Sequence, residues 1–227
     1  MRPLLKIGHR GAAGHAPENT LTAIRKGIEL GADSVEIDLR CTADGVLVAL
    51  HDATVNRTTN GKGRVDGLSL ADIRTLSAGK DERIPTLEEV LGVATGKAGV
   101  MLELKVAGLA HLAAETVRRT GFKGPVIYAS FLHEELPHVR SVDRDALLMV
   151  LFGRLPRAPV ARAMAQSPTH VGLRHDTVTR RLVEEFHRED LLVWVYTADN
   201  RRDIQRVISV GVDGVISNFP DRIGRQQ

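Results

Sequence analysis

Short apolar runs rich in β-branched residues alternate with helical patterns along almost the whole chain. Runs of this kind, with little internal polar alternation, are typical of parallel strands that are buried on both faces. The sequence predicts eight strands, at residues 4–8, 34–39, 100–104, 126–129, 146–152, 170–173, 191–196 and 214–217. Between them, helical periodicity and capping residues predict helices at residues 20–30, 109–120, 134–139, 160–165, 180–188 and 200–210.

Eight strands with intervening helices in 227 residues indicate an α/β protein. A closed (β/α)8 TIM barrel fits this count better than an open doubly wound sheet, because such barrels commonly occupy about 200–250 residues as one domain. The chain shows no second hydrophobic repeat that would require another domain. We therefore expect a single barrel domain over residues 1–227.

One segment interrupts the alternation between the second and third expected strands. It starts with the turn Asp44-Gly45 before the apolar run 46–50, which is typical of a β-hairpin. A polar, glycine-rich stretch at 56–67 and two short helical patterns follow. We expect a small insertion after the second strand, with an excursion over residues 53–97 that overhangs the barrel mouth.

Charge and cysteine content exclude several classes of protein. The 31 basic and 28 acidic residues give a net charge of +3, and they are interspersed, so we expect no nucleic-acid partner. The single Cys41 excludes an intrachain disulfide and a multi-thiolate metal site. No signal-peptide core and no apolar run near the ~18 residues of a membrane span is present. We expect a cytoplasmic protein without a stable membrane anchor, whose oligomeric state the sequence does not indicate.

Ionisable residues occur at the expected ends of three strands. In a TIM barrel the reactive groups lie at the carboxyl ends of the strands, where the loops meet. The groups that this rule selects are His9 and Arg10 after the first strand, Glu36 and Asp38 on the second, and Glu103 and Lys105 on the third. We therefore expect them to share one site.

Two carboxylates stand two residues apart on the second strand. Side chains at this spacing project to the same face, so Glu36 and Asp38 should point together into the barrel mouth. Glu103 adds a third carboxylate from the next strand. Oxygen ligands without thiolates suit one hard divalent cation, Mg²⁺ or Ca²⁺. The alternative is a buried structural network in which Arg40 or Lys105 neutralises the carboxylates.

The hairpin should return His51 to the acidic pair, because its turn places the partner of Asp38 near position 51. His9 and His51 would then flank the same cation site, with Arg10 beside them. Two imidazoles around a bound anion can serve as general acid and general base in phosphoryl transfer. Trp194, the only tryptophan, is either a core residue or a platform that binds substrate.

Several short motifs occur together in the first half of the chain. They are HRG at 9–11, PENT at 17–20, EID at 36–38, DG at 44–45 with HD at 51–52, RTTNG at 57–61, IPTLEE at 84–89 and ELK at 103–105. In this combination the chain resembles the glycerophosphodiester phosphodiesterase family, over roughly residues 8–220. The resemblance implies a (β/α)8 barrel with an inserted segment and a hydrolase of glycerol and lipid metabolism.

The reaction that the resemblance implies is hydrolysis of a glycerophosphodiester to an alcohol and sn-glycerol 3-phosphate. It assigns the metal to Glu36, Asp38 and Glu103, and acid–base catalysis to His9 and His51. Arg10 and Lys105 would lie near the phosphate. Glu18 and Asn19 match acidic and amide groups that lie close to the site in the family.

The chain departs from the family pattern near its C-terminal end, with Tyr196-Thr197 after Trp194 and Ser217-Asn218 before Pro220. We expect these departures to affect the substrate side of the pocket and to leave the metal ligands and histidines unchanged.

Two other functions are compatible with the same residues. One is a lysophospholipase D-like or sphingolipid-headgroup phosphodiesterase of this fold, and the other is a non-catalytic barrel that binds a sugar phosphate. An enzyme acting on lipids needs an apolar docking surface. The excursion 53–97 contains no aromatic residue and is mainly polar, so we expect a small, hydrated glycerophosphodiester as substrate.

Overall fold

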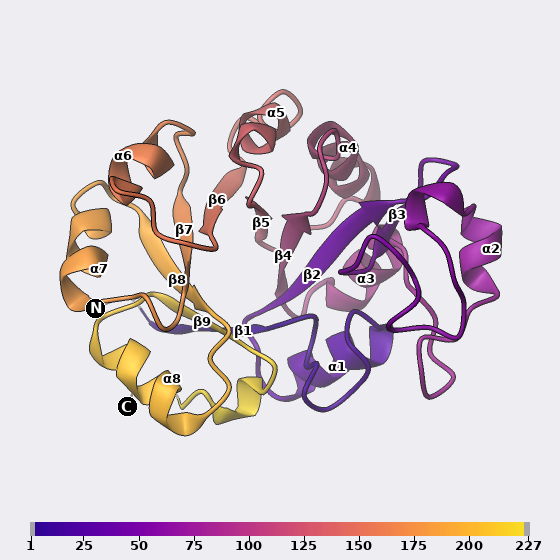
Figure 1. The fold of residues 1–227 in the computed structure, drawn as a ribbon, viewed down its shortest axis with the longest axis horizontal. Coiled ribbons are helices and arrows are strands. Elements are labelled where there is room, and N and C mark those ends of the chain that lie inside the picture. The colour runs from indigo at the N-terminus through magenta and orange to yellow at the C-terminus, as the bar shows by residue number, and fades with distance from the viewer. Residues whose placement is uncertain (1–2, 225–227) are drawn as a thin grey trace.

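The computed structural model describes residues 3–224, and within that range eight of the nine strands are parallel and close into a barrel. Closure depends on β1, which pairs with β9 on one side and with β2 on the other. The prediction of a (β/α)8 TIM barrel is confirmed (Figure 1). The barrel strands are β1 (Leu5–Gly8), β2 (Ser34–Cys41), β4 (Gly99–Leu104), β5 (Val126–Ser130), β6 (Leu147–Phe152), β7 (His170–Arg174), β8 (Leu192–Tyr196) and β9 (Gly214–Ser217).

Helices surround the strands as an outer ring (Figure 1). They are α1 (Leu21–Glu29), α3 (Leu87–Ala94), α4 (Ala110–Thr120), α5 (Leu136–Val139), α6 (Pro159–Met164), α7 (Arg180–His187) and α8 (Arg201–Ser209). Short 3-10 helices occupy Val65–Gly67, His133–Glu135 and Pro220–Arg222. Within residues 3–224, none of the helices has the length and apolar character needed to cross a membrane.

Side-chain caps explain where several helices begin. The Thr20 hydroxyl accepts from the backbone N–H of Ala23 at the start of α1. At α3, Thr86 and Glu89 form a reciprocal capping box, which satisfies two backbone donors that the helix itself leaves unpaired. Asn200 caps α8 in the same way as Thr20 caps α1.

The strands separate two apolar regions. The larger core lies between the barrel and its helices, and it includes Val35, Ile37 and Leu39 on β2. The smaller one fills the barrel interior with Ile7, Met101, Ile127, Ala129, Met149, Leu151, Trp194 and Ile216. Strand β2 therefore turns its apolar residues outward, which directs the alternating Glu36 and Asp38 inward as the spacing predicts.

The excursion is only partly separate from the ring. It contains β3 (Leu47–Ala49), which runs antiparallel to β2, and α2 (Leu70–Arg74), and it projects from the barrel at the right of Figure 1. An apolar cluster of its own, which includes Val55 and Ile73, holds it together. Helix α3, at the end of the expected excursion, instead packs between α1 and α4. It is thus the ring helix that follows β2.

Gly214 on β9 tests how tightly the barrel interior is packed. A Cβ added there would lie 2.7 Å from Cδ1 of Trp194, so we expect Gly214→Ala to destabilise the fold by about 1–3 kcal/mol. Gly92 on α3 has open space around its Cα. Gly92→Ala should instead stabilise by about 0.5–1 kcal/mol. Urea unfolding of both variants checks the pair, and equal effects would contradict this packing.

Candidate active site

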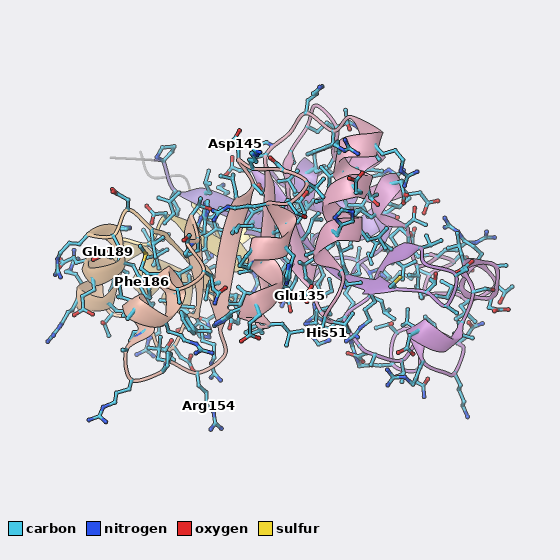
Figure 2. All side chains as sticks on the ribbon, turned by 90° about the horizontal axis from the view of Figure 1, so that it is seen from above. His51, Glu135, Asp145, Arg154, Phe186 and Glu189 are labelled. Carbon is cyan, nitrogen blue, oxygen red and sulfur yellow. The ribbon has the colours of Figure 1, made fainter. Side chains whose placement is uncertain are left out.

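A cavity of about 230 Å³ opens at the carboxyl ends of the strands. Figure 2 shows Asp145, before β6, and Arg154, after β6, at opposite ends of the barrel, with His51 toward the Arg154 end. The lining residues are His9, Arg10, Glu36, His51, Met101, Glu103, Lys105, Phe131, Leu151, Tyr196, Thr197 and Ile216. The ionisable groups therefore lie at the carboxyl ends of the strands, as the sequence predicts.

Three carboxylates form an acidic cluster at this cavity, and two of them, Glu36 and Glu103, line it. Asp38 of β2 lies beside Glu103 of β4 in the parallel register, and Glu36 stands two residues earlier on β2. One oxygen from each of the three lies within 4.8 Å of the others. The Oε1 atom of Glu36 and the Oδ1 atom of Asp38 are buried without a hydrogen-bond partner among the described residues.

The protein leaves this acidic cluster poorly neutralised. Burial raises the pKa of Glu36 well above its ordinary value, and the nearby charges of Asp38 and Glu103 raise it further. Burial and Asp38 also raise the pKa of Glu103. Buried carboxylate oxygens without donors are costly unless they meet a cation. The donor set is oxygen only, so the cluster fits a hard divalent ion.

Two cationic side chains approach the cluster from either side. Lys105 Nζ lies 2.6 Å from Glu103 Oε1 and 3.4 Å from Asp38 Oδ1, and Arg10 Nε lies 3.2 Å from Asp38 Oδ2. Burial opposes the charge on Lys105, but Glu103 and Asp38 raise its pKa and keep it protonated. Arg40 points elsewhere and donates twice to the backbone carbonyl of His51. The alternative of a structural ion-pair network is thus present in part, through Lys105.

His9 follows β1 and faces the acidic cluster. Its Nε2 atom lies 3.9 Å from Glu36 Oε2, while Nδ1 lies 2.7 Å from Oδ1 of Asn218. Burial lowers the pKa of His9, and the neighbouring Arg10 lowers it further. The contact with Asn218 corrects one expectation from the sequence. The departure at this position touches a histidine directly, because the loop after β9 returns beside β1.

His51 reaches the cavity from the hairpin outside the barrel. The N–H of Leu50 donates to the carbonyl of Asp38 at 2.9 Å, so His51 follows directly after the residue opposite Asp38. Its Nδ1 atom lies 2.7 Å from Oδ1 of Asp52. The Arg57 guanidinium, and then His51, hold the pKa of Asp52 well below its usual range. Asp52 is therefore an ionised acceptor that orients the imidazole.

A chain of charged groups joins the excursion to the barrel mouth. Arg57 donates to both oxygens of Glu18, at 2.9 and 2.7 Å, as well as to Asp52. Glu18 also accepts from Arg10 at 2.7 Å. Asn19 follows Glu18 and holds Asp38 twice, through its amide nitrogen and its amide oxygen. Glu18 and Asn19 of the PENT motif thus hold the side chains of Arg10 and Asp38 in place beside the cavity.

Apolar and aromatic side chains line the cavity beside the charged groups. Phe131, in the loop after β5, packs edge to face with Tyr196 at 5.9 Å between ring centroids. The structure does not bring Trp194 into the cavity, because its side chain is fully buried in the barrel interior. Phe131 was not among the residues that the sequence predicted for the site. Its position directly after a strand was the signal that could have found it.

Comparison with known proteins identifies a protein family that matches this chain. Residues 9–222 match the Glycerophosphoryl diester phosphodiesterase family. The chain belongs to this family. The match covers nearly all of the described chain, and it confirms the resemblance seen in the motifs.

Members of the family are similar to the chain over nearly their whole length. The glycerophosphodiester phosphodiesterase of Caldanaerobacter subterraneus is 32% identical over 96% of both chains. A solved phosphodiesterase of Oleispira antarctica, in complex with the product sn-glycerol-3-phosphate, is 26% identical with a TM-score of 0.91, covering 97% of this chain and 95% of that one. The glycerophosphodiester phosphodiesterase of Agrobacterium tumefaciens is 30% identical with a TM-score of 0.83, covering 97% and 98%.

The raised pKa of Glu36 predicts a pH-dependent stability of the metal-free protein. Because the folded state disfavours the ionised carboxylate, stability is lost as pH rises from the ordinary value of 4.5 through the higher folded pKa. Glutamine cannot ionise. In EDTA at pH 7, Glu36→Gln should therefore be more stable than the parent, and the difference should shrink as pH falls and be absent below pH 4.5.

Urea titrations across pH measure this difference. The matched control is Glu29→Gln on the exposed surface of α1, where the change should stay within about 0.5 kcal/mol. Equal stability of Glu36→Gln and the parent at pH 7 would contradict the claim that the folded state disfavours the ionised form of Glu36.

Proposed function

We propose that the chain hydrolyses glycerophosphodiesters to an alcohol and sn-glycerol 3-phosphate, by metal-dependent catalysis with His9 and His51 as acid and base. Membership of the family makes it a glycerophosphodiester phosphodiesterase. The observation that supports the finer mechanism is a cluster of three carboxylates, two of them with a buried oxygen that lacks a hydrogen bond, beside a cavity that two imidazoles and two cationic side chains line.

Glu36, Asp38 and Glu103 are the residues that would hold the divalent cation, Mg²⁺ or Ca²⁺. The cation would supply positive charge against the phosphate oxygens as negative charge develops in the transition state. It would also relieve the repulsion that raises the pKa of Glu36. The oxygen-only donor set supports this assignment.

The remaining charged groups suit a phosphodiester. Arg10 and Lys105 line the cavity and present donors that can bind the phosphate. His9 and His51 line it from two different elements, so a bound phosphate can lie between them. One imidazole would take a proton from the nucleophile, and the other would give a proton to the leaving oxygen. Trp194, fully buried, has no part in this proposal.

Two observations support a small glycerophosphodiester as the substrate. The Oleispira antarctica phosphodiesterase holds sn-glycerol-3-phosphate, which supports the same product here. The polar excursion, tied to the mouth through Arg57 and Glu18, suits a small hydrated headgroup. A non-catalytic sugar-phosphate barrel would have no need for the two histidines. We also propose a cytoplasmic protein without a nucleic-acid partner or a stable membrane anchor, which the lone Cys41 and the balanced charge support.

One observation favours a second candidate substrate. Phe131 and Leu132 are 43% and 41% exposed in the loop after β5, and Phe131 lines the cavity. Exposed apolar side chains at a cavity mouth can hold an acyl chain. A lysophospholipase D-like activity on acylated diesters, or one on sphingolipid headgroups, is therefore the alternative.

Chelation and histidine substitution test the mechanism. Glycerophosphocholine turnover should cease after exhaustive treatment with EDTA and return with added Mg²⁺ or Ca²⁺. His9→Ala and His51→Ala should each lower kcat by about 10²- to 10⁴-fold, because general acid–base catalysis contributes that much. KM should change far less. His111→Ala, on α4 of the outer ring, is the control. Activity that survives chelation, or near-normal turnover of either cavity variant, would remove that group from the mechanism.

A substrate comparison decides between the two classes. Under identical metal and salt conditions, kcat/KM for glycerophosphocholine or glycerophosphoethanolamine should clearly exceed that for the corresponding lysolipid. Leu132→Ser, at the exposed rim, should leave the rate on the deacylated diester unchanged. A preference for the lysolipid, or faster turnover on vesicles that Leu132→Ser removes, would replace the first assignment with the second.

A further inference from the structure

The side-chain amide of Asn218 lies between a histidine and a carboxylate. Its Oδ1 atom is 2.7 Å from Nδ1 of His9, and its Nδ2 atom donates to Oδ2 of Asp199 at 2.7 Å. Asp199 belongs to the loop between β8 and α8, and it is absent from the cavity lining. The hydrogen-bonded path from Asp199 to His9 therefore runs through Asn218.

Asp199 is itself held in one orientation. Its Oδ1 atom accepts from the backbone N–H of Asn218 at 2.8 Å and from the Ser217 hydroxyl at 3.0 Å. The same hydroxyl oxygen accepts from the N–H of Phe219 at 3.0 Å, which directs the Ser217 proton toward Asp199. Both carboxylate oxygens of Asp199 thus have donors assigned to them.

These contacts determine how the amide must point. An ionised carboxylate only accepts hydrogen bonds, so the amide of Asn218 must turn its NH₂ toward Asp199. Its carbonyl oxygen then faces His9, and an amide oxygen also only accepts. The proton of His9 must therefore be on Nδ1, which leaves the Nε2 lone pair on the side of Glu36 and the cavity.

We propose that Asp199 is a positioning residue that, through Asn218, fixes His9 in the tautomer with the proton on Nδ1. The proposal rests on the proposed function in one respect, that His9 Nε2 acts on the substrate. The hydrogen-bond polarity runs in one direction, from His9 to Asn218 to Asp199. Reversing the polarity of one member should then reverse the tautomer of His9.

Asp199→Asn makes that reversal with almost no change of shape. The new amide must keep its oxygen at the Oδ1 position, where two donors meet it, so its NH₂ takes the Oδ2 position. Two NH₂ groups then face each other, and Asn218 must flip. The flipped amide presents NH₂ to His9 Nδ1, which has to give up its proton, and the proton moves to Nε2.

Exchanging the two residues should restore the original tautomer. In the double variant Asp199→Asn with Asn218→Asp, the amide at 199 donates to the carboxylate at 218. That carboxylate can only accept, so His9 again donates from Nδ1. A merely structural role of the pair predicts no such rescue, because the double variant removes both native side chains.

Histidine NMR reads the tautomer without any need for activity. Long-range ¹H–¹⁵N spectra distinguish protonated from unprotonated ring nitrogens, and a His9→Gln variant assigns the signals. Wild type should show His9 protonated at Nδ1, Asp199→Asn at Nε2, and the double variant at Nδ1 again. The control is Asp221→Asn, which breaks the exposed pair with His15 and should leave His9 unchanged.

Kinetics supply the second readout. Asp199→Asn should lower kcat on glycerophosphocholine by about 10²- to 10⁴-fold with little change in KM, as a wrong histidine tautomer does elsewhere. The double variant should recover most of that loss. A wild-type His9 protonated at Nε2, or an unchanged signal in Asp199→Asn, would overturn the proposal. If no variant hydrolyses any diester, the proposed function falls, while the spectra still decide the tautomer.

Discussion

Three carboxylates confined at the mouth of one barrel set the conditions for the rest of the site. Burial and mutual repulsion raise the pKa of Glu36, and its neighbours Asp38 and Glu103 cannot move apart because strand register fixes them side by side. Positive charge must therefore gather around them. Arg10 and Lys105 supply part of that charge, and the unpartnered oxygens leave room for a cation.

Closure of the barrel brings together groups that are distant in sequence. Strand β1 lies between β2 and β9, so His9 meets Glu36 on one side and Asn218 on the other. An open sheet would leave β1 and β9 at separate edges. The site thus depends on the same hydrogen bonds that complete the fold, which couples the stability of the β1 pairing to the geometry of His9.

Much of this arrangement could be predicted from the sequence, for definite physical reasons. Period-two alternation on β2 indicated that Glu36 and Asp38 share a face, and the Asp44-Gly45 turn indicated that the hairpin returns His51. These are local rules. The contact of Asn218 with His9 spans 209 positions and depends on barrel closure, so no local pattern indicated it. The sequence left Trp194 open between a core residue and a substrate platform, because its depth in the barrel depends on the packing against Gly214.

His9 and His51 are positioned by different parts of the fold. His9 extends directly from a barrel strand, whereas His51 follows β3 on the hairpin and is braced by Arg57 from the excursion. Insertions or deletions between β3 and α3 would therefore displace one imidazole relative to the other, while length changes after β6 or β7 would not. Variation in loop length is tolerated unequally around this barrel, and the segment that looks most like a dispensable surface appendage is the one whose length matters most.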